Sequence, residues 1–184
     1  IMQIEYEATF ADINKDNIRK KLQDADAVLV RPEYLQKRVT FRLPKGHEMK
    51  GAWLRVRDEE NKITMSLKVV DGSRIEDQKE LLLEVNDFEQ TVEFLQMIGC
   101  EQKSYQENRC ELWTLDDTEI TIDEWSFLEP LVEIEGKTYE FLGVPGEVLT
   151  TGDHVECVLR KTANVQSHEV IYYGIKIKKL KEAT

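Results

Sequence analysis

The sequence predicts an α+β fold: a closed antiparallel β-barrel with a charged interior and helices packed on the outside. Most segments between turns alternate apolar and polar residues with period two, which is the pattern of strands. Only two segments show good helical spacing, so few helices are available to cover the sheet. The polar faces of the strands carry charged pairs of the same sign, which need an opposite charge nearby.

The first elements expected are a strand and a helix. Residues 3–10 alternate strictly between apolar and polar side chains, as a strand does. A helix is expected from about Asn14 to Asp24, because apolar residues at helical spacing form one face there. Asn14 or Asp12 is placed to cap its first turn.

A group of strands follows this helix. A short apolar strand covers residues 27–30, and Pro32 is expected to end it. A hairpin loop at residues 58–62 and a turn at Asp71-Gly72 separate later strands. These further strands are expected at residues 38–43, 53–57, 63–69 and 79–85.

The second helix is expected to start at Asp87. Gln90 is placed to complete a capping box with it, and Gly99 is placed to stop the helix. Three more strands are expected at residues 103–113, 119–125 and 131–135. The order of strand, helix and strand group therefore occurs twice, as an architectural echo without a residue-level repeat.

The length of 184 residues predicts a single domain spanning residues 1–184. Its core is expected at residues 3–136. The pattern weakens in the tail, residues 137–184, where short helices near 139–142 and 155–161 and strand character in 170–178 are expected.

Composition limits the partners and the compartment. The net charge of -11 argues against a general nucleic-acid-binding surface, which needs a broad basic face. No apolar run approaches the roughly 20 residues of a membrane span, and no secretory signal is expected. Three cysteines without a CxxC pair suggest neither a disulfide framework nor a zinc site. We expect a cytoplasmic protein without a nucleic-acid or membrane partner; a homodimer stays open.

The charged pairs are the informative feature of the strands. A sheet with one solvated face would explain any one of them. Yet like charges at positions i and i+2 repel, and the cost grows when water is excluded. Carboxylate pairs would be relieved by a hard divalent cation, and paired arginines by phosphate oxygens. A metal-bound triphosphate would satisfy both kinds. The pairs include Glu5 with Glu7, Arg55 with Arg57, and Glu133 with Glu135.

The order of four short runs resembles the CYTH domain. This family of triphosphate tunnel metalloenzymes includes class IV adenylyl cyclases, thiamine triphosphatases and inorganic triphosphatases. The likeness covers about residues 3–136 and implies an eight-stranded antiparallel tunnel with polar side chains inside. The runs are Ile4-Glu5-Tyr6-Glu7-Ala8-Thr9, Trp53-Leu54-Arg55-Val56-Arg57, residues 64–68, and Leu131-Val132-Glu133-Ile134-Glu135-Gly136.

The resemblance implies roles for individual residues. The carboxylates that it assigns to Mg²⁺ or Mn²⁺ are those of Glu5, Glu7, Asp123, Glu133 and Glu135. The side chains that it assigns to the triphosphate are Arg55, Arg57, Lys68, Lys103 and Arg109. No catalytic residue is assigned outright, and the candidates are Glu5, Glu7 and Lys68. Glu80 and Glu84 stand where the family often has further tunnel acids.

Two positions depart from the family pattern. The first strand normally reads Glu-x-Glu-x-Lys, and here its last position is Thr9. Because that lysine contacts phosphate or helps to activate water in family members, its absence bears on hydrolysis more than on binding. Arg42 stands where many members have an acidic residue.

Three functions are compatible with these residues. The leading hypothesis is metal-dependent hydrolysis of a small-molecule triphosphate such as tripolyphosphate, thiamine triphosphate or ATP. A class IV adenylyl cyclase making cyclic AMP from ATP is the second. A non-catalytic triphosphate- or nucleotide-binding protein is the third.

Overall fold

The computed structural model describes residues 2–72, 77–116 and 118–136. The helices and the strand expected in the tail, and the extent of the single domain predicted for residues 1–184, involve residues outside this description. Within it, the chain forms two compact units. The first consists of residues 2–5 and 34–109, and the second of residues 6–33 and 110–136.

Two helices and nine strands make up the described residues. The paired strands run antiparallel, as β3 does with β4, β4 with β5, and β8 with β9. The expected α+β class with an antiparallel sheet is thereby confirmed. The elements are β1 (Gln3–Ile4), β2 (Tyr6–Phe10), α1 (Lys15–Asp24), β3 (Val28–Arg42), β4 (Ala52–Asp58), β5 (Ile63–Val70), β6 (Gln78–Val85), α2 (Phe88–Met97), β7 (Glu101–Leu115), β8 (Thr118–Trp125) and β9 (Leu128–Gly136).

The first strand changes partner at Glu5. One strand was expected over residues 3–10, but β1 pairs with β6 whereas β2 pairs with β9. The sheet order is β1-β6-β5-β4-β3-β7-β8-β9-β2, so its first and last strands are joined in the chain by Glu5 alone. The division at Glu5 explains nine strands where eight were expected.

The strand β3 is continuous where two strands were expected. Pro32 does not end it, since β3 runs from Val28 to Arg42. Its register with β4 extends from Lys37 to Phe41, so Pro32 lies outside that ladder. The backbone N–H donor that proline lacks is therefore not needed for pairing with β4.

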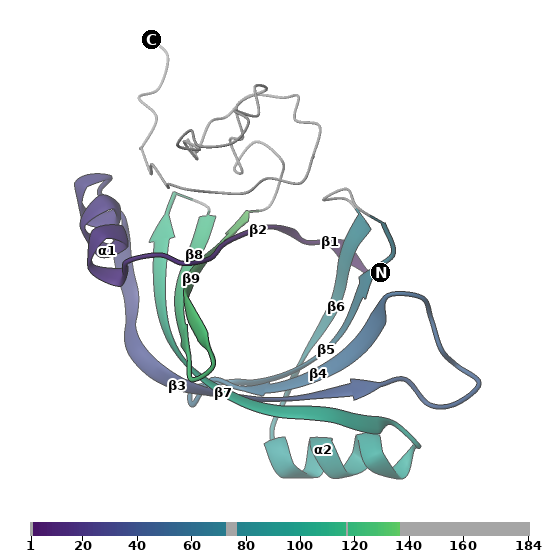
Figure 1. Cartoon of the computed structure of the whole chain (residues 1–184). Coiled ribbons are helices and arrows are strands. Elements are labelled where there is room, and N and C mark those ends of the chain that lie inside the picture. Colours follow the sequence, from purple (N-terminus) through teal and green to yellow (C-terminus); the bar gives the residue numbers. More distant parts are fainter. Residues whose placement is uncertain (1, 73–76, 117, 137–184) are drawn as a thin grey trace. The chain divides into compact units, whose positions relative to one another are not determined.

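The helix α2 covers the apolar face of the first unit, where it contacts β4 (Figure 1). Asp87 caps it by accepting a hydrogen bond from the Gln90 backbone N–H at 2.8 Å. Gly99 follows its end with φ of 92°, a left-handed conformation suited to glycine, as expected. Each fully buried side chain here stabilises the fold by about 1.5–3 kcal/mol. The buried set is Val39, Phe41, Val56, Phe88, Leu95 and Cys100.

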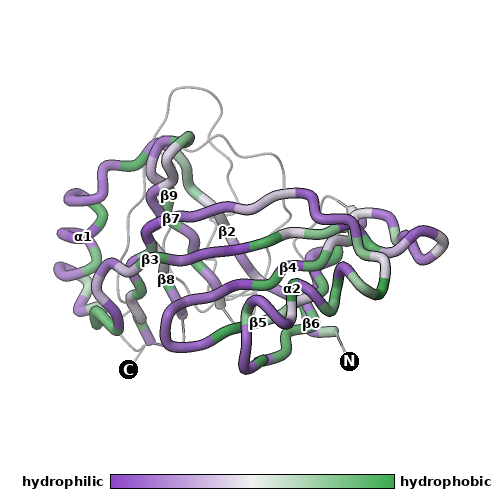
Figure 2. Tube along the Cα trace, turned by 90° about the horizontal axis from the view of Figure 1, so that it is seen from below, coloured by the Kyte–Doolittle hydropathy of each residue, from purple (hydrophilic) through white to green (hydrophobic). Residues whose placement is uncertain are grey.

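The helix α1 belongs to the second unit. The Asn14 side chain caps it by accepting a hydrogen bond from the Asn17 N–H at 2.9 Å. Hydrophobic and hydrophilic stretches alternate along the helix (Figure 2), and Ile18 and Leu22 are its buried residues. The core of this unit also contains Phe10, Ala25, Cys110, Trp113, Leu115, Ile120, Ile122, Val132 and Ile134.

The apolar cores use one face of the strands and leave the other face to polar side chains. Along β4, Val56 is fully buried in the core, and the flanking Arg55 and Arg57 lie on the opposite face. Along β9, Val132 and Ile134 are buried, and Glu133 and Glu135 alternate with them. Neither described helix has the length and apolar composition of a membrane span.

Candidate functional site

Four basic side chains share the polar face of the first unit. Arg55 lies directly opposite Ser66 in the register of β4 and β5, and Lys68 is two residues further along β5. Arg57 lies directly opposite Arg38 on β3. We refer to Arg38, Arg55, Arg57 and Lys68 as the cationic face. The clustering of Arg55, Arg57 and Lys68 on one face agrees with the alternation expected from the sequence.

Buried or half-buried carboxylates pair with three members of the cationic face. Lys68 Nζ lies 2.7 Å from Glu5 Oε1, and their side chains are 10% and 6% exposed. Arg55 Nη2 lies 3.1 Å from Glu80 Oε1. Arg57 Nη2 lies 2.6 Å from Glu59 Oε1.

These ion pairs balance the charges of Arg55, Arg57 and Lys68. A fixed anion could replace the carboxylates, because arginine guanidinium groups match phosphate oxygens in geometry. Glu84, which was expected with Glu80, is exposed and lies opposite Thr64.

Arg38 was missed by sequence reasoning. Its Nη2 donates to Gln36 Oε1 and, at 3.2 Å, to Asn108 Oδ1. Both amide side chains are 3% exposed, so they are well placed to fix the guanidinium in position. Two arginines directly opposite each other repel by up to about 1 kcal/mol. Alternation along the chain could not identify Arg38, because it has no basic neighbour at i+2. Only the pairing of β3 with β4 places it beside another arginine.

The structure does not bring Lys103 and Arg109 onto the cationic face. On β7, Ser104 and Asn108 point toward that face, because they hydrogen-bond Thr40 and Arg38. Lys103 and Arg109 alternate with them and are exposed. These two side chains therefore lie on the other side of β7.

Acidic side chains share the polar face of the second unit. Glu7 lies opposite Glu135 and Thr9 opposite Glu133 in the register of β2 and β9. Asp123 shares this face and is 3% exposed. Thr121 Oγ1 donates to Asp123 Oδ2 at 2.8 Å. We call Glu7, Asp123, Glu133 and Glu135 the acidic face, and all four were expected from the sequence.

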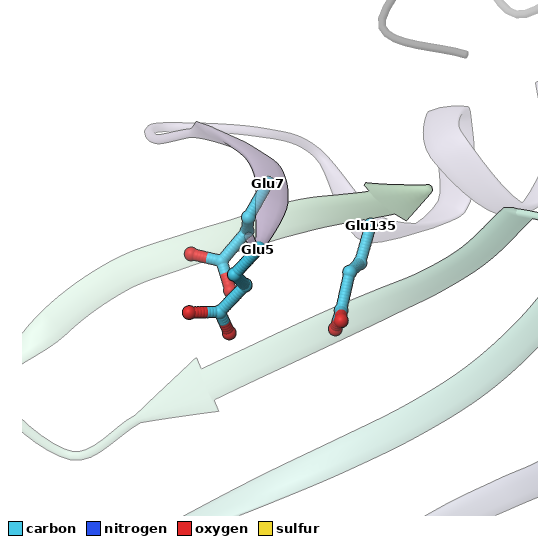
Figure 3. Close-up of side chains that lie close together, drawn as sticks. All are labelled: Glu5, Glu7 and Glu135. Atoms are coloured by element: carbon cyan, nitrogen blue, oxygen red, sulfur yellow. The ribbon is translucent and has the colours of Figure 1, made fainter. Parts of the chain in front are cut away.

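Three of the expected metal ligands come close together. Carboxylate oxygens of Glu5, Glu7 and Glu135 all lie within 4.8 Å of one another. The three side chains extend from the backbone in the same general direction (Figure 3). Because Mg²⁺ and similar ions bind oxygens at about 2.0–2.6 Å, ligands around one ion are separated by distances of this size. The residues therefore fit a hard divalent cation, and Glu5 is common to this group and to the ion pair with Lys68.

Other charged residues hold α1 in place. Arg19 Nη2 lies 2.8 Å from Glu111 Oε2, which belongs to a buried carboxylate that also accepts from Trp113 Nε1. The hydrogen bond that Arg19 donates to Glu111 is the main cause that raises the pKa of Arg19. Burial works to lower the pKa of Lys15, but its hydrogen bonds to Glu124 and Glu33 outweigh burial and raise it. Trp113 is accordingly a packing residue, 4% exposed.

Several solved structures resemble the fold of this chain. No family model and no curated protein matches the sequence. A protein from Pyrococcus horikoshii OT3 is 25% identical, with a TM-score of 0.63 over 73% of this chain and 79% of its own. A candidate adenylate cyclase from Vibrio parahaemolyticus is 14% identical, with a TM-score of 0.64 over 74% and 78%.

A third solved structure carries a description of activity. It is a candidate adenylyl cyclase from Hippeastrum for which a dominant triphosphatase activity is described. It is 13% identical to this chain, with a TM-score of 0.50 over 74% of this chain and 81% of its own. These likenesses show that the chain shares its fold with all three proteins.

Proposed function

We propose that this chain, which shares its fold with two candidate adenylyl cyclases, is a CYTH-type metal-dependent enzyme that binds a small-molecule triphosphate and hydrolyses it. The observation that carries the proposal is the position of the Glu5 carboxylate. This carboxylate forms an ion pair with Lys68 of the cationic face and lies within 4.8 Å of the carboxylates of Glu7 and Glu135. A cation-binding and an anion-binding group thus meet at one residue.

The cationic face supports the anion-binding part. Arg55, Arg57 and Lys68 would hold the phosphates, and their guanidinium and ammonium groups would neutralise charge that develops during phosphoryl transfer. A carboxylate already positions each of these three side chains. Phosphate binding would therefore require little movement of the side chains beyond replacing the carboxylate partner by a phosphate oxygen.

The carboxylates support the cation-binding part. Glu5, Glu7 and Glu135 would hold Mg²⁺ or Mn²⁺, with Glu133 and Asp123 on the same strand face as Glu7 and Glu135. When bound, such an ion supplies charge for phosphate oxygens and polarises water. No lysine stands at the end of β2, because Thr9 occupies that position.

Two solved structures favour a second reaction on the same site. The Vibrio and Hippeastrum proteins are candidate adenylyl cyclases, and a cyclase would use the same cations to hold ATP. The difference is the nucleophile, which is a ribose hydroxyl in place of water. A protein that binds without turnover is the third candidate, and the threonine at position 9 is the feature that favours it.

One assay separates these reactions. Purified protein is incubated with tripolyphosphate, thiamine triphosphate or ATP, with and without Mg²⁺ or Mn²⁺, and both phosphate and cyclic AMP are measured. We expect metal-dependent phosphate release from at least one compound. Cyclic AMP from ATP would favour the cyclase, and tight binding without either product would favour the binding protein.

Variants locate the activity. Arg57→Ala and Lys68→Ala should each lower the affinity for tripolyphosphate by at least about tenfold, because a hydrogen-bonded charge pair is lost. Lys45→Ala removes an exposed lysine outside the cationic face and serves as the control. Unchanged affinity in both variants would exclude the cationic face as the binding site.

A further inference from the structure

Ser66 is a buried hydroxyl on the cationic face. It lies on β5, directly opposite Arg55, and two residues before Lys68. Its side chain is 2% exposed. Within the described residues, Ser66 Oγ has no hydrogen-bond partner.

Ser66 is buried although it does not lie on the apolar face of β5. Met65 packs against the apolar core, whereas Ser66 alternates with it and shares its face with Thr64 and Lys68. A buried hydroxyl without a partner costs free energy, because it has lost its hydrogen bonds to water. An alanine would fill the position without that cost. The hydroxyl is therefore explained best by an acceptor that arrives with a ligand.

Charge on this face identifies the acceptor. Arg55 lies directly across from Ser66, and Lys68 is its neighbour on the same face, so an anion is attracted there. A hydroxyl donates one hydrogen bond in a defined direction, and a phosphate oxygen accepts such bonds strongly.

We propose that Ser66 Oγ donates a hydrogen bond to a phosphate oxygen of the ligand held by Arg55 and Lys68. Ser66 is then a substrate-binding residue. The proposal rests on the proposed function and extends it: the arginine and the lysine supply attraction, and the hydroxyl fixes which oxygen of the phosphate chain sits between them.

Removing the hydroxyl should have opposite effects on binding and on stability. Ser66→Ala should lower the affinity for tripolyphosphate about tenfold, as loss of a hydrogen bond to a charged group does. The melting temperature of the ligand-free protein should stay the same or rise, because an unsatisfied hydroxyl is removed. Ser66→Cys keeps a weak donor and should lie between alanine and serine in affinity.

Thr118 provides a matched control. Its hydroxyl is also buried without a partner in the described part of the chain, and its side chain is 1% exposed. On β8 it shares the apolar face of the second unit with Ile120 and Ile122. Thr118→Val should therefore leave tripolyphosphate affinity unchanged while also preserving or raising the melting temperature.

Isothermal titration calorimetry with tripolyphosphate and a chelator measures affinity without metal, and thermal unfolding measures stability. Unchanged affinity in Ser66→Ala overturns the proposal, as does an equal loss in Thr118→Val. A lowered melting temperature in Ser66→Ala also overturns it, since the hydroxyl would then be structural. If Arg55→Ala and Lys68→Ala weaken binding while Ser66→Ala does not, only the role of Ser66 fails; if none weakens binding, the proposed function fails too.

Discussion

Replacing Lys68 with methionine should strengthen metal binding to the protein that holds no phosphate. Lys68 Nζ lies 2.7 Å from one oxygen of Glu5, and both side chains are buried. A cation that binds Glu5 must compete with this ammonium group. Methionine is a long apolar side chain without charge, so it leaves the Glu5 carboxylate to the metal.

The size of the effect follows from the burial of the pair. Two unit charges 4 Å apart interact by about 4 kcal/mol at an effective dielectric constant of 20. Part of that attraction is offset by the cost of keeping both charges away from water. The net competition expected is about 1–3 kcal/mol, the usual coupling free energy between two sites, which corresponds to about 5–150-fold in metal affinity.

The same competition couples the two ligands in the unmodified protein. Metal alone leaves Lys68 without Glu5, and triphosphate alone leaves Glu5 without Lys68. When both bind, each charge has a new partner, so each ligand should strengthen the binding of the other. Lys68→Met should reduce this coupling because it removes one side of the exchange.

Calorimetric titration with Mn²⁺, in phosphate-free buffer, measures the effect directly. Arg55→Met is the matched control, since Arg55 pairs with Glu80, which is outside the carboxylate group of Glu5, Glu7 and Glu135. Glu5→Gln should weaken Mn²⁺ binding. If Lys68→Met and Arg55→Met change Mn²⁺ affinity equally, the specific competition for Glu5 does not exist.

Three further outcomes follow from the strand faces. Arg38→Gln should lower tripolyphosphate affinity about tenfold in calorimetry, because it removes a fixed charge from the cationic face; unchanged affinity would place Arg38 outside the binding site. Lys103→Ala and Arg109→Ala should each change that affinity by less than about twofold, since both side chains are exposed on the other side of β7; a tenfold loss would show that the ligand reaches that side. The hydrogen bond to Glu107 raises the pKa of Tyr105 to about 12, so this contact stabilises the fold fully below the usual tyrosine pKa of 10.0 and the contribution is lost as pH rises through about 12. Glu107→Gln should lower the pKa of Tyr105 toward 10.0, as followed by tyrosinate absorbance with Tyr105→Phe as the blank; an unchanged titration would contradict the contact.

Period-two alternation predicted much of the candidate site because it fixes which residues share a face. It placed Arg55 with Arg57 and Glu133 with Glu135, and the structure agrees. On β7 both faces are polar, so alternation alone could not say which one meets the cationic face. The hydrogen bond between Thr40 and Ser104 decides it.

Features that depend on pairing between strands were harder to predict. The change of partner at Glu5 leaves the alternation of residues 3–10 intact, so the sequence shows no break there. Arg38 joins Arg57 only through the register of β3 with β4. Pro32 is compatible with a strand because it lies outside that ladder, so the backbone N–H that proline lacks is not needed there. Each of these is a non-local fact that neighbouring residues do not encode.

The interleaving of the two compact units constrains how the gene can be divided. Each unit is assembled from separate stretches of chain, and the strands β3 and β7 run from one unit into the other. No single cut in the coding sequence therefore yields one unit complete and leaves the other intact. One cut that leaves both units complete therefore cannot separate the residues proposed to hold phosphate from those proposed to hold metal.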